Sequence, residues 1–425
     1  MRALFTTYEG GGHVPPALTV ARKLQERGAE VLFVSDEATR PAAERAGLPF
    51  EPWRTAPNRS VQAAADDPLE DWKARAPWGV VRAVCDAVMT GPAGRYAADT
   101  LDLIERFRPD VVVSMELLLG CMAAAERSGT PLALLTGNLW SLPTREDVPP
   151  FGPAFRASDA KWARNRDAFT RRLIGRWYDA GLPALNAARA QIGLAPLAHV
   201  LDQVDAAELI LLGVARALDW GGAPPPASFV YAGPLLSVPE WVNETAPAAA
   251  ADERPLVLAS LSTTFQDQTP VMRRIIEAMG RLPIRGIATL GPAMRVEDVP
   301  RPPNVEVVAS ASHDELVPRC AAVVCHGGHG TVLRPLLHGV PVLCLPMGRD
   351  QPENAVRIAA RGAGLTVPSG SSPGRIAAAL RRLLDEPTYG EHARRLGSAV
   401  ATEIDGGLRA AEAIERLAAQ RRRMV

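Results

Sequence analysis

Short apolar runs alternate along the chain with longer stretches in which apolar residues recur at helical spacing. The short runs predict β-strands and the longer stretches predict helices. Strands separated by helices are typical of an α/β fold with a parallel, doubly wound sheet. The strands expected in the first half are Arg2–Thr6, Glu30–Ser35, Asp110–Ser114, Leu132–Leu135 and Glu208–Gly213. Those expected in the second half are Leu256–Ser260, Arg285–Leu290, Val305–Ala309, Ala321–Cys325, Val340–Leu345 and Leu365–Val367.

This pattern is interrupted between Trp220 and Pro255, where Gly, Pro and Ala dominate and predict a linker. A chain of 425 residues is also too long for one ordinary hydrophobic core. We therefore expect two doubly wound domains followed by a mostly helical C-terminus. The expected parts are an N-terminal domain (1–235), a linker (236–254), a second domain (255–405) and a final helix (406–425) that packs back on the first domain.

Composition and charge exclude several classes of protein. Lys and Arg together number 47, as do Asp and Glu, so no net charge attracts nucleic acid or an anionic membrane. No apolar run is long enough to span a membrane, and the N-terminus enters an expected strand without a signal-peptide pattern. The cysteines are odd in number and mostly lie in apolar runs, which favours reduced, buried thiols in a cytoplasmic protein. They are Cys85, Cys121, Cys320, Cys325 and Cys344.

The stretch from Val323 to Asn354 carries the strongest functional signal. An expected strand leads into a Gly-rich turn, His326–Thr331, and then into a short helix and a second strand. Glycines allow close backbone approach, and the free amides and dipole of a helix N-terminus stabilise negative charge, so this turn can hold a diphosphate. The lysine of a P-loop and the GxGxxG of a dinucleotide site are both missing. Asp350 and Gln351 follow, and both suit sugar hydroxyls, so the stretch indicates a nucleotide-sugar site.

A second Gly-rich turn, Gly10–Gly12, lies after the first expected strand and is followed by His13. A helix is expected to begin near Val14, where prolines are tolerated in the first turn. The helix dipole disfavours the imidazolium form, which keeps the His13 ring neutral and able to accept a proton. A lone histidine is more often structural. The glycines beside His13 and its place at the mouth of the sheet make it a candidate general base.

Two less regular stretches, Trp53–Arg95 and Leu139–Pro183, contain five tryptophans among prolines and apolar residues. Ligands of doubly wound sheets bind beyond the carboxyl ends of the strands, where these two stretches are expected to lie. One interpretation is the wall of a pocket for a hydrophobic acceptor. The other, equally open for each tryptophan, is aromatic packing beneath long loops. The tryptophans are Trp72, Trp78, Trp140, Trp162 and Trp177.

A zinc site is the alternative interpretation of the Gly-rich turn. Cys320, Cys325, His326 and His329 are close in sequence. A buried strand and a glycine turn give poor spacing for tetrahedral ligands, and no CxxC pair is present. We therefore expect neither a metal nor another cofactor.

These motifs together resemble family 1, UDP-glycosyltransferase-like enzymes of the GT-B fold, and most of all the bacterial enzymes that glycosylate natural products. The resemblance covers nearly the whole chain and implies two Rossmann-like domains that face a central cleft. It rests on His13 after three glycines, Thr263 in SLSTT, the run HGGHGT…GVP…DQPENA, and PALNAARAQIGLAPL at Pro183–Leu197.

The resemblance implies an inverting transfer of a sugar from an NDP-sugar, UDP- or dTDP-linked, to a hydroxyl of a small aromatic or polyketide-like acceptor. His13 would act as the general base. His326 and the amides of the turn would contact the diphosphate, Asp350 and Gln351 the sugar, and His313 the base through its backbone. The implied donor-binding residues are Thr263, His313, His326, Gly328, Gly330, Thr331, Asp350 and Gln351.

The chain departs from the family pattern at two places. Where relatives have an aspartate that orients the histidine, this chain has Met115, and Glu116 follows one residue later. Alternation along a strand would point these two side chains to opposite faces, so either Glu116 replaces the aspartate or no such pair exists. Where relatives stack the base on a Trp-x-Pro-Gln motif, this chain has Ser310–His313, and Arg334 stands where plant relatives have a ribose-binding glutamate. UDP and dTDP are not separated by these residues.

Two other functions stay open at this point. A GT-B epimerase would act on a nucleotide-sugar without an acceptor, and product analysis without added acceptor would identify it. A non-catalytic nucleotide-sugar-binding protein would have lost its base, and donor hydrolysis or transfer above background would exclude it.

Overall fold

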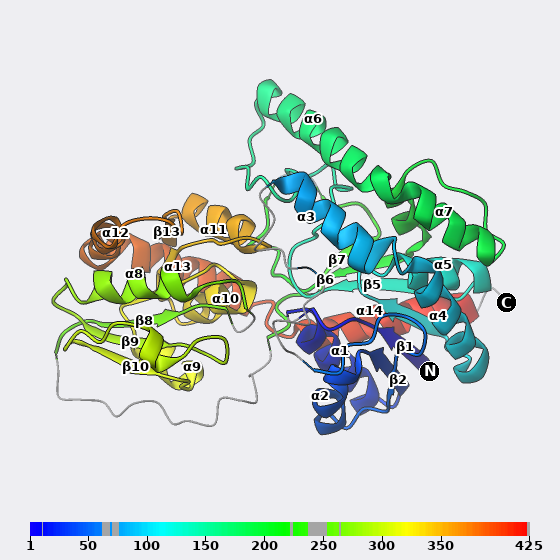
Figure 1. Cartoon of the computed structure of the whole chain (residues 1–425), viewed down its shortest axis with the longest axis horizontal. Helices are drawn as coiled ribbons and strands as arrows, with labels where there is room; N and C mark the ends of the chain where they lie inside the picture. Colours follow the sequence, from blue (N-terminus) through cyan, green and yellow to red (C-terminus); the bar gives the residue numbers. More distant parts are fainter. Residues whose placement is uncertain are drawn as a thin grey trace.

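A computed structural model describes residues 1–10, 12–61, 69, 76–221, 224–236, 253–262 and 265–422 (Figure 1). Two parallel sheets, each covered by helices, form the two halves of the molecule. The predicted α/β class with doubly wound sheets is thereby confirmed. Thr263, Trp72 and most of the expected linker lie outside the described residues.

The N-terminal sheet has the strand order β3-β2-β1-β4-β5-β6-β7, and all its pairs are parallel. All five expected strands are present. The two that the sequence did not predict, β3 and β7, are edge strands of three residues, too short to show an apolar run. The strands are β1 (Arg2–Thr6), β2 (Glu30–Ser35), β3 (Phe50–Pro52), β4 (Val111–Ser114), β5 (Leu132–Thr136), β6 (Leu209–Leu212) and β7 (Phe229–Tyr231).

The second sheet has the order β10-β9-β8-β11-β12-β13, again parallel, and contains all six expected strands. In each sheet the chain order reverses beside the first strand, at β1/β4 and at β8/β11. Ligands of doubly wound sheets bind at such switch points, beyond the carboxyl ends of the strands. The strands are β8 (Leu256–Ser260), β9 (Arg285–Thr289), β10 (Val305–Val308), β11 (Ala322–Cys325), β12 (Val342–Cys344) and β13 (Gly364–Thr366).

Helices cover both sheets. The apolar side chains of β1 alternate between two hydrophobic clusters, with Leu4 in one and Phe5 in the other, because a sheet covered on both faces is apolar on both. The helices of the first half are α1 (Val14–Glu26), α2 (Arg40–Arg45), α3 (Pro77–Val84), α4 (Ala93–Phe107), α5 (Leu119–Ser128), α6 (Lys161–Tyr178) and α7 (Leu182–Gln191). Those of the second half are α8 (Thr269–Met279), α9 (His313–Leu316), α10 (His329–Leu337), α11 (Gln351–Ala360), α12 (Pro373–Asp385), α13 (Pro387–Ala401) and α14 (Gly406–Arg422).

The stretch Leu139–Pro183, expected to be irregular, contains the 18-residue helix α6. This expectation was wrong because α6 buries only Ala163, Ile174 and Tyr178 and therefore lacks the apolar stripe that reveals a helix. None of the helices in the described part of the chain is long and apolar enough to cross a membrane.

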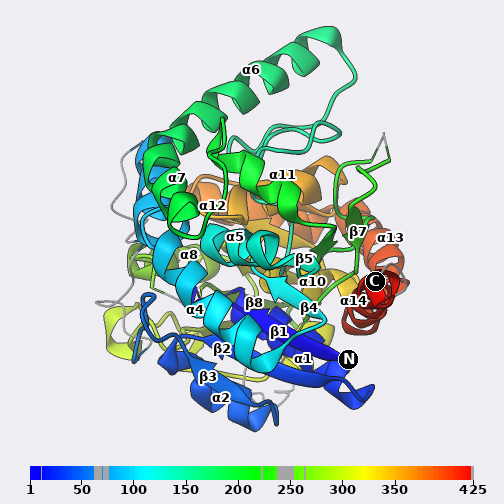
Figure 2. The ribbon, with the colours of Figure 1, turned by 90° about the vertical axis from the view of Figure 1, so that its right-hand side faces the viewer.

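The last helix, α14, returns to the first half of the molecule and lies beside α1 (Figures 1 and 2). Ala410, Ile414 and Leu417 join the hydrophobic cluster that covers one face of the N-terminal sheet. Arg27 and Glu415 form an ion pair of 2.8 Å at the edge of this contact. The C-terminal helix therefore forms a second connection between the two halves of the molecule, in addition to the segment that links β7 to β8.

Candidate active site

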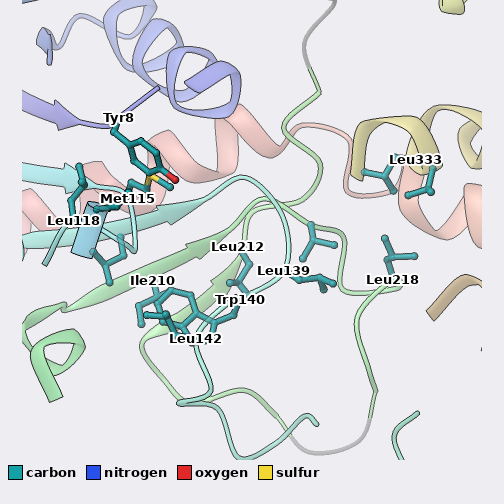
Figure 3. Packing of buried hydrophobic residues seen from close by; sticks show 14 of the residues in the cluster. Tyr8, Met115, Leu118, Leu139, Trp140, Leu142, Ile210, Leu212, Leu218 and Leu333 are labelled. Atoms are coloured by element: carbon teal, nitrogen blue, oxygen red, sulfur yellow. The ribbon is translucent and has the colours of Figure 1, made fainter. Parts of the chain in front are cut away.

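The turn between β1 and α1 places His13 at the mouth of the N-terminal sheet. His13 is the N-cap residue of α1, and prolines occupy the first helical turn, as expected. The half-buried His13 ring lies with its centroid 6.4 Å from that of Tyr8. Tyr8 in turn packs in one cluster with Met115, toward which it points (Figure 3). One side of His13 is therefore walled by an apolar surface.

Two glycines bring the ends of the neighbouring strands against this turn. A Cβ on Gly137, after β5, would lie 2.7 Å from Pro16 Cγ. A Cβ on Gly213, after β6, would lie 2.8 Å from the carbonyl oxygen of Gly137. Side chains at either position would separate these segments, so both glycines are required by close approach rather than by flexibility.

The Gly-rich turn of the second domain holds His326 in a fixed place between β11 and α10. Gly327 has φ +93°, a conformation that favours glycine, and a Cβ on Gly328 would lie 2.4 Å from His326 Nε2. His326 is only 6% exposed, and its Nδ1 finds no hydrogen-bond partner among the described residues. Burial lowers the pKa of His326 to about 4, although Asp350 opposes the shift. The ring is therefore neutral at pH 7, and its Nδ1 is buried.

Helix α10 begins at this turn with an open N-terminus. The first backbone N–H groups of an α-helix, here those of His329, Gly330 and Thr331, have no partner within the helix. The hydroxyl of Thr331 donates to the Gly328 carbonyl oxygen at 2.8 Å and fixes the first turn. A Cβ on Gly330 would meet no described atom within 4 Å. This is the local geometry that binds a phosphate group.

The Gly-rich turn His326–Thr331 lies directly against the strand ends of the first domain. His329 Nε2 donates to the Gly213 carbonyl oxygen at 3.1 Å. Asn138, after β5, donates to Asp350 Oδ2 at 2.9 Å. Since Gly213 packs on Gly137 and Gly137 on the start of α1, the structure brings the His13 turn and the Gly-rich turn His326–Thr331 to the same region between the two sheets.

The two residues expected to bind the sugar differ in their surroundings. Asp350 is half-buried and also accepts from Asn354 Nδ2 at 2.8 Å. Gln351 is 2% exposed, accepts from the Met347 amide at 2.8 Å and donates to Gln266 Oε1 at 2.7 Å. In this structure Asp350 is the more accessible of the pair, and Gln351 fixes the start of α11.

The ring of His313 points into its own domain. Its Nε2 lies 3.2 Å from Thr289 Oγ1, and it lines a cavity of about 10 Å³ together with Ser260, Thr331 and Arg334. Burial lowers the pKa of His313 to about 4, with a smaller contribution from Arg334.

Of the two alternatives left open for Glu116, the described residues show the one without a hydrogen bond to His13. Strand β4 ends at Ser114, and Met115 takes the position beside Tyr8. Glu116 is fully buried, its Oε1 accepts from Ser141 Oγ at 3.1 Å, and its Oε2 has no partner in the described part of the chain. Alternation at the strand end explains the outcome, since it sends adjacent side chains to opposite sides.

The tryptophans expected in an acceptor wall divide into two groups. Trp140 is 4% exposed and packs at 5.2 Å on Phe229, so it belongs to the core. Trp78 and Trp162 are 60% and 64% exposed, and the Trp78 ring lies 6.3 Å from that of Trp177. Core packing thus accounts for Trp140, whereas the exposed rings of Trp78 and Trp162 are accessible to a ligand.

Comparison with known proteins agrees with this architecture. Residues 273–407 match the family described as "Erythromycin biosynthesis protein CIII-like, C-terminal domain". The 4'-demethylrebeccamycin synthase of Lentzea aerocolonigenes is 30% identical over 404 residues, 93% of this chain and 94% of the relative. The TDP-daunosamine transferase DnrS of Streptomyces peucetius is 34% identical over 180 residues, 40% of each chain. A crystal structure of the glycosyltransferase of kitacinnamycin has a TM-score of 0.74 at 22% identity and covers 98% of both chains.

Two doubly wound domains, with the Gly-rich turn of the second seated on the strand ends of the first, define the GT-B fold. The chain belongs to the glycosyltransferases of bacterial natural-product biosynthesis, which transfer a sugar from a nucleotide-sugar. The predicted family and enzyme class are therefore confirmed. The relatives are transferases, and they give no support to the epimerase or the non-catalytic alternative.

Sequence reasoning missed the residues that join the two domains. Asn138 and His329 each reach a partner more than a hundred positions away, at sequence separations of 212 and 116 residues. No local pattern reports such contacts. A signal was available for Glu353 and Arg357, which are charged and four residues apart on the helix that follows Gln351.

We expect His326 and His313 to make the protein less stable in acid. His326 and His313 stay neutral when folded down to about pH 4, whereas their ordinary pKa is 6.5. Between these values the unfolded chain binds more protons, so the free energy of unfolding is retained above pH 6.5 and falls as the pH drops toward 4. Each histidine contributes about 1.4 kcal/mol per pH unit in this window.

Urea unfolding at several pH values tests this expectation. The double variant His326→Gln/His313→Gln should lose stability less steeply between about pH 6.5 and 4.5 than the wild type. His199→Gln serves as the control, because its exposed ring pairs with Asp179, which raises the pKa of His199 instead. An unchanged slope in the double variant would contradict the assignment.

Proposed function

We propose that this enzyme is an inverting glycosyltransferase that moves a sugar from a dTDP- or UDP-sugar to a hydroxyl of a small hydrophobic acceptor, with His13 as the general base. The observation that carries the proposal is the seating of the diphosphate turn on Gly213, beside the His13 turn. A donor on α10 and an acceptor beside His13 would then meet between the two sheets. A dTDP-sugar is the first donor to test, because one relative is a TDP-daunosamine transferase.

The reaction uses these groups in one displacement. His13 accepts the proton of the acceptor hydroxyl as its oxygen forms a bond to the anomeric carbon. The bond from that carbon to the diphosphate oxygen breaks on the opposite side, so the configuration inverts. The diphosphate leaves with the bonding electrons, and the α10 amides and His326 stabilise its charge. The proton on His13 then passes to solvent.

The apolar surroundings of His13 support a hydrophobic acceptor. Tyr8 and Met115 form a wall beside the histidine, and helices α3 and α6 add the exposed rings of Trp78 and Trp162. Burial of an aromatic or polyketide-like ring system against such surfaces would drive binding, while the hydroxyl is directed toward His13.

A donor and acceptor panel followed by mass spectrometry tests the function. We expect transfer from dTDP- or UDP-sugars to aromatic or polyketide-like hydroxyl compounds, with inversion of the anomeric configuration in the product. Activity should persist in EDTA, because amides and His326 are assigned to compensate the diphosphate. A strict requirement for a divalent metal would overturn this assignment, and retention of configuration would overturn the single displacement.

A further inference from the structure

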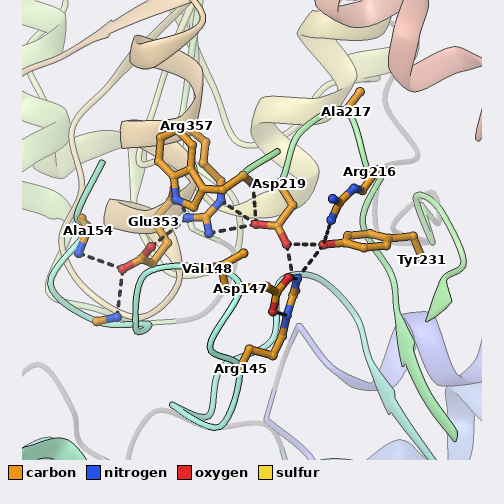
Figure 4. A network of polar contacts seen from close by, with 12 residues as sticks. Arg145, Asp147, Val148, Ala154, Arg216, Ala217, Asp219, Tyr231, Glu353 and Arg357 are labelled. Carbon is orange, nitrogen blue, oxygen red and sulfur yellow. Dashed lines mark hydrogen bonds and ion pairs between the residues drawn. The ribbon is translucent and has the colours of Figure 1, made fainter. Parts of the chain in front are cut away.

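Helix α11 connects the donor site with the acceptor side of the cleft. Its N-cap is Asp350, expected at the sugar, and Gln351 begins its first turn. The first turn also carries Glu353 and the next turn carries Arg357, which are 1% and 3% exposed although both are charged. Both side chains reach the N-terminal domain, where a network of polar contacts receives them (Figure 4). Buried charges of this kind persist only when they are fully paired.

Glu353 holds one end of the loop that follows β5. Its Oε1 accepts the backbone N–H groups of Gly152 at 2.9 Å and of Ala154 at 2.8 Å. Both loop residues have positive φ, +117° for Gly152 and +54° for Ala154. A non-glycine residue is strained in this region, so surrounding contacts must maintain it. A carboxylate of the donor domain therefore fixes the conformation of a loop in the acceptor domain.

Arg357 holds the other end of the same loop. It donates to Glu353 Oε2 at 2.7 Å and to Asp219 Oδ1 at 3.0 Å. Asp219 is 1% exposed and also accepts from Arg145, at the start of the loop, at 2.9 Å. Burial would raise the pKa of Asp219, but Arg357 and Arg145 outweigh it and lower the pKa. The ionised Asp219 thus joins Arg357 to Arg145.

We propose that Glu353 is a positioning residue that shapes the acceptor side of the cleft from the donor domain, by fixing loop 145–154. The inference rests on the transfer function proposed above. The loop leaves the carboxyl end of β5, the same sheet edge that carries His13. Because Asp350 caps α11 and Glu353 lies in the first turn of the same helix, this helix joins the expected sugar site to loop 145–154.

Steady-state kinetics with the acceptor found in the panel test this role. Glu353→Met keeps the volume but removes the hydrogen-bond acceptors, and it should raise the acceptor KM about tenfold or more. We expect kcat and the Kd for dTDP or UDP to change by less than about twofold, because neither the base nor the diphosphate turn is altered. Glu353→Gln still offers an oxygen to both amides and should return the acceptor KM to within about threefold of wild type.

Glu386→Ala is the matched control, because it removes an exposed glutamate from an ion pair with Arg382 in the same domain. It should leave all these constants unchanged. An unchanged acceptor KM in Glu353→Met would overturn the proposal. Equal losses of kcat and nucleotide affinity would also overturn it, since they would indicate general damage to the donor domain.

Amide hydrogen exchange tests the loop without any acceptor. In Glu353→Met, peptides that cover 145–154 should exchange at least about tenfold faster, while peptides of α4 stay as in wild type. If this variant fails to fold, Glu353→Met/Arg357→Met leaves no buried charge unpaired on α11 and should show the same local change. Faster exchange throughout the chain, or none in the loop, would overturn the proposal. If wild type transfers no sugar, the function proposed above fails, and the exchange result still decides the loop contact.

Discussion

His326→Ala is expected to lower the affinity for dTDP or UDP by about tenfold to a hundredfold and to remove most sugar transfer. A hydrogen bond between a protein group and a charged phosphate contributes about 1.5–3 kcal/mol. His326 is expected to provide it, because its buried ring is held against Gly328, the N-cap of α10. Isothermal titration calorimetry with each nucleotide measures the effect directly.

His338→Ala is the matched control for that measurement. His338 is an exposed histidine at the C-terminal end of α10, so it shares the helix but lies away from the diphosphate turn. It should bind both nucleotides like wild type. Nucleotide affinity that is unchanged in His326→Ala, with the fold intact by circular dichroism, would show that the diphosphate does not lie on this turn.

The strands of both sheets could be predicted because buried parallel strands are nearly continuous apolar runs. β1, β2 and β8 match their expected bounds for this reason. Elements without such a run were missed. β3 and β7 are short edge strands, and α6 exposes Trp162 and Phe169 instead of burying an apolar stripe.

The site could be predicted only where its chemistry is local. Glycines and histidines adjacent in sequence identified the two turns, because a helix N-terminus that binds phosphate is built from consecutive residues. The contact of the second domain with the first depends on Gly213, Asn138 and Asp219, which have no motif of their own. Glu116 shows most clearly what the sequence could not predict. Adjacent side chains of a strand point to opposite faces, so a shift of one position decides whether a side chain lies on the face of His13.

His13→Ala is expected to reduce transfer to hydroxyl acceptors by about 10²–10⁴, the usual contribution of a general base. The Kd for dTDP or UDP should stay within about twofold of wild type, since His13 lies on the other domain from the α10 amides. Quenched assays with saturating donor and acceptor give kcat, and calorimetry gives the nucleotide Kd. Retained turnover in His13→Ala would mean that another group removes the proton. The assignment of His13 as general base would then be wrong, and the assignment of the donor site would be unaffected.

Glu116→Gln then decides whether the base has a charged partner. The variant keeps the shape of the side chain and its contact with Ser141 but removes the charge. Because Glu116 makes no hydrogen bond to His13 within the described residues, we expect kcat within about threefold of wild type and an unchanged acidic limb of the pH–rate profile. The rates should be followed across about pH 5.5 to 9, the range in which histidines titrate. A Glu116→Gln enzyme that turns over at least tenfold more slowly, with its acidic limb moved to lower pH, would show that Glu116 swings toward His13 during transfer and stabilises the imidazolium. In that case Glu116 would do the work of the aspartate that relatives have at the position of Met115. Met115→Asp should then not raise the rate above that of wild type.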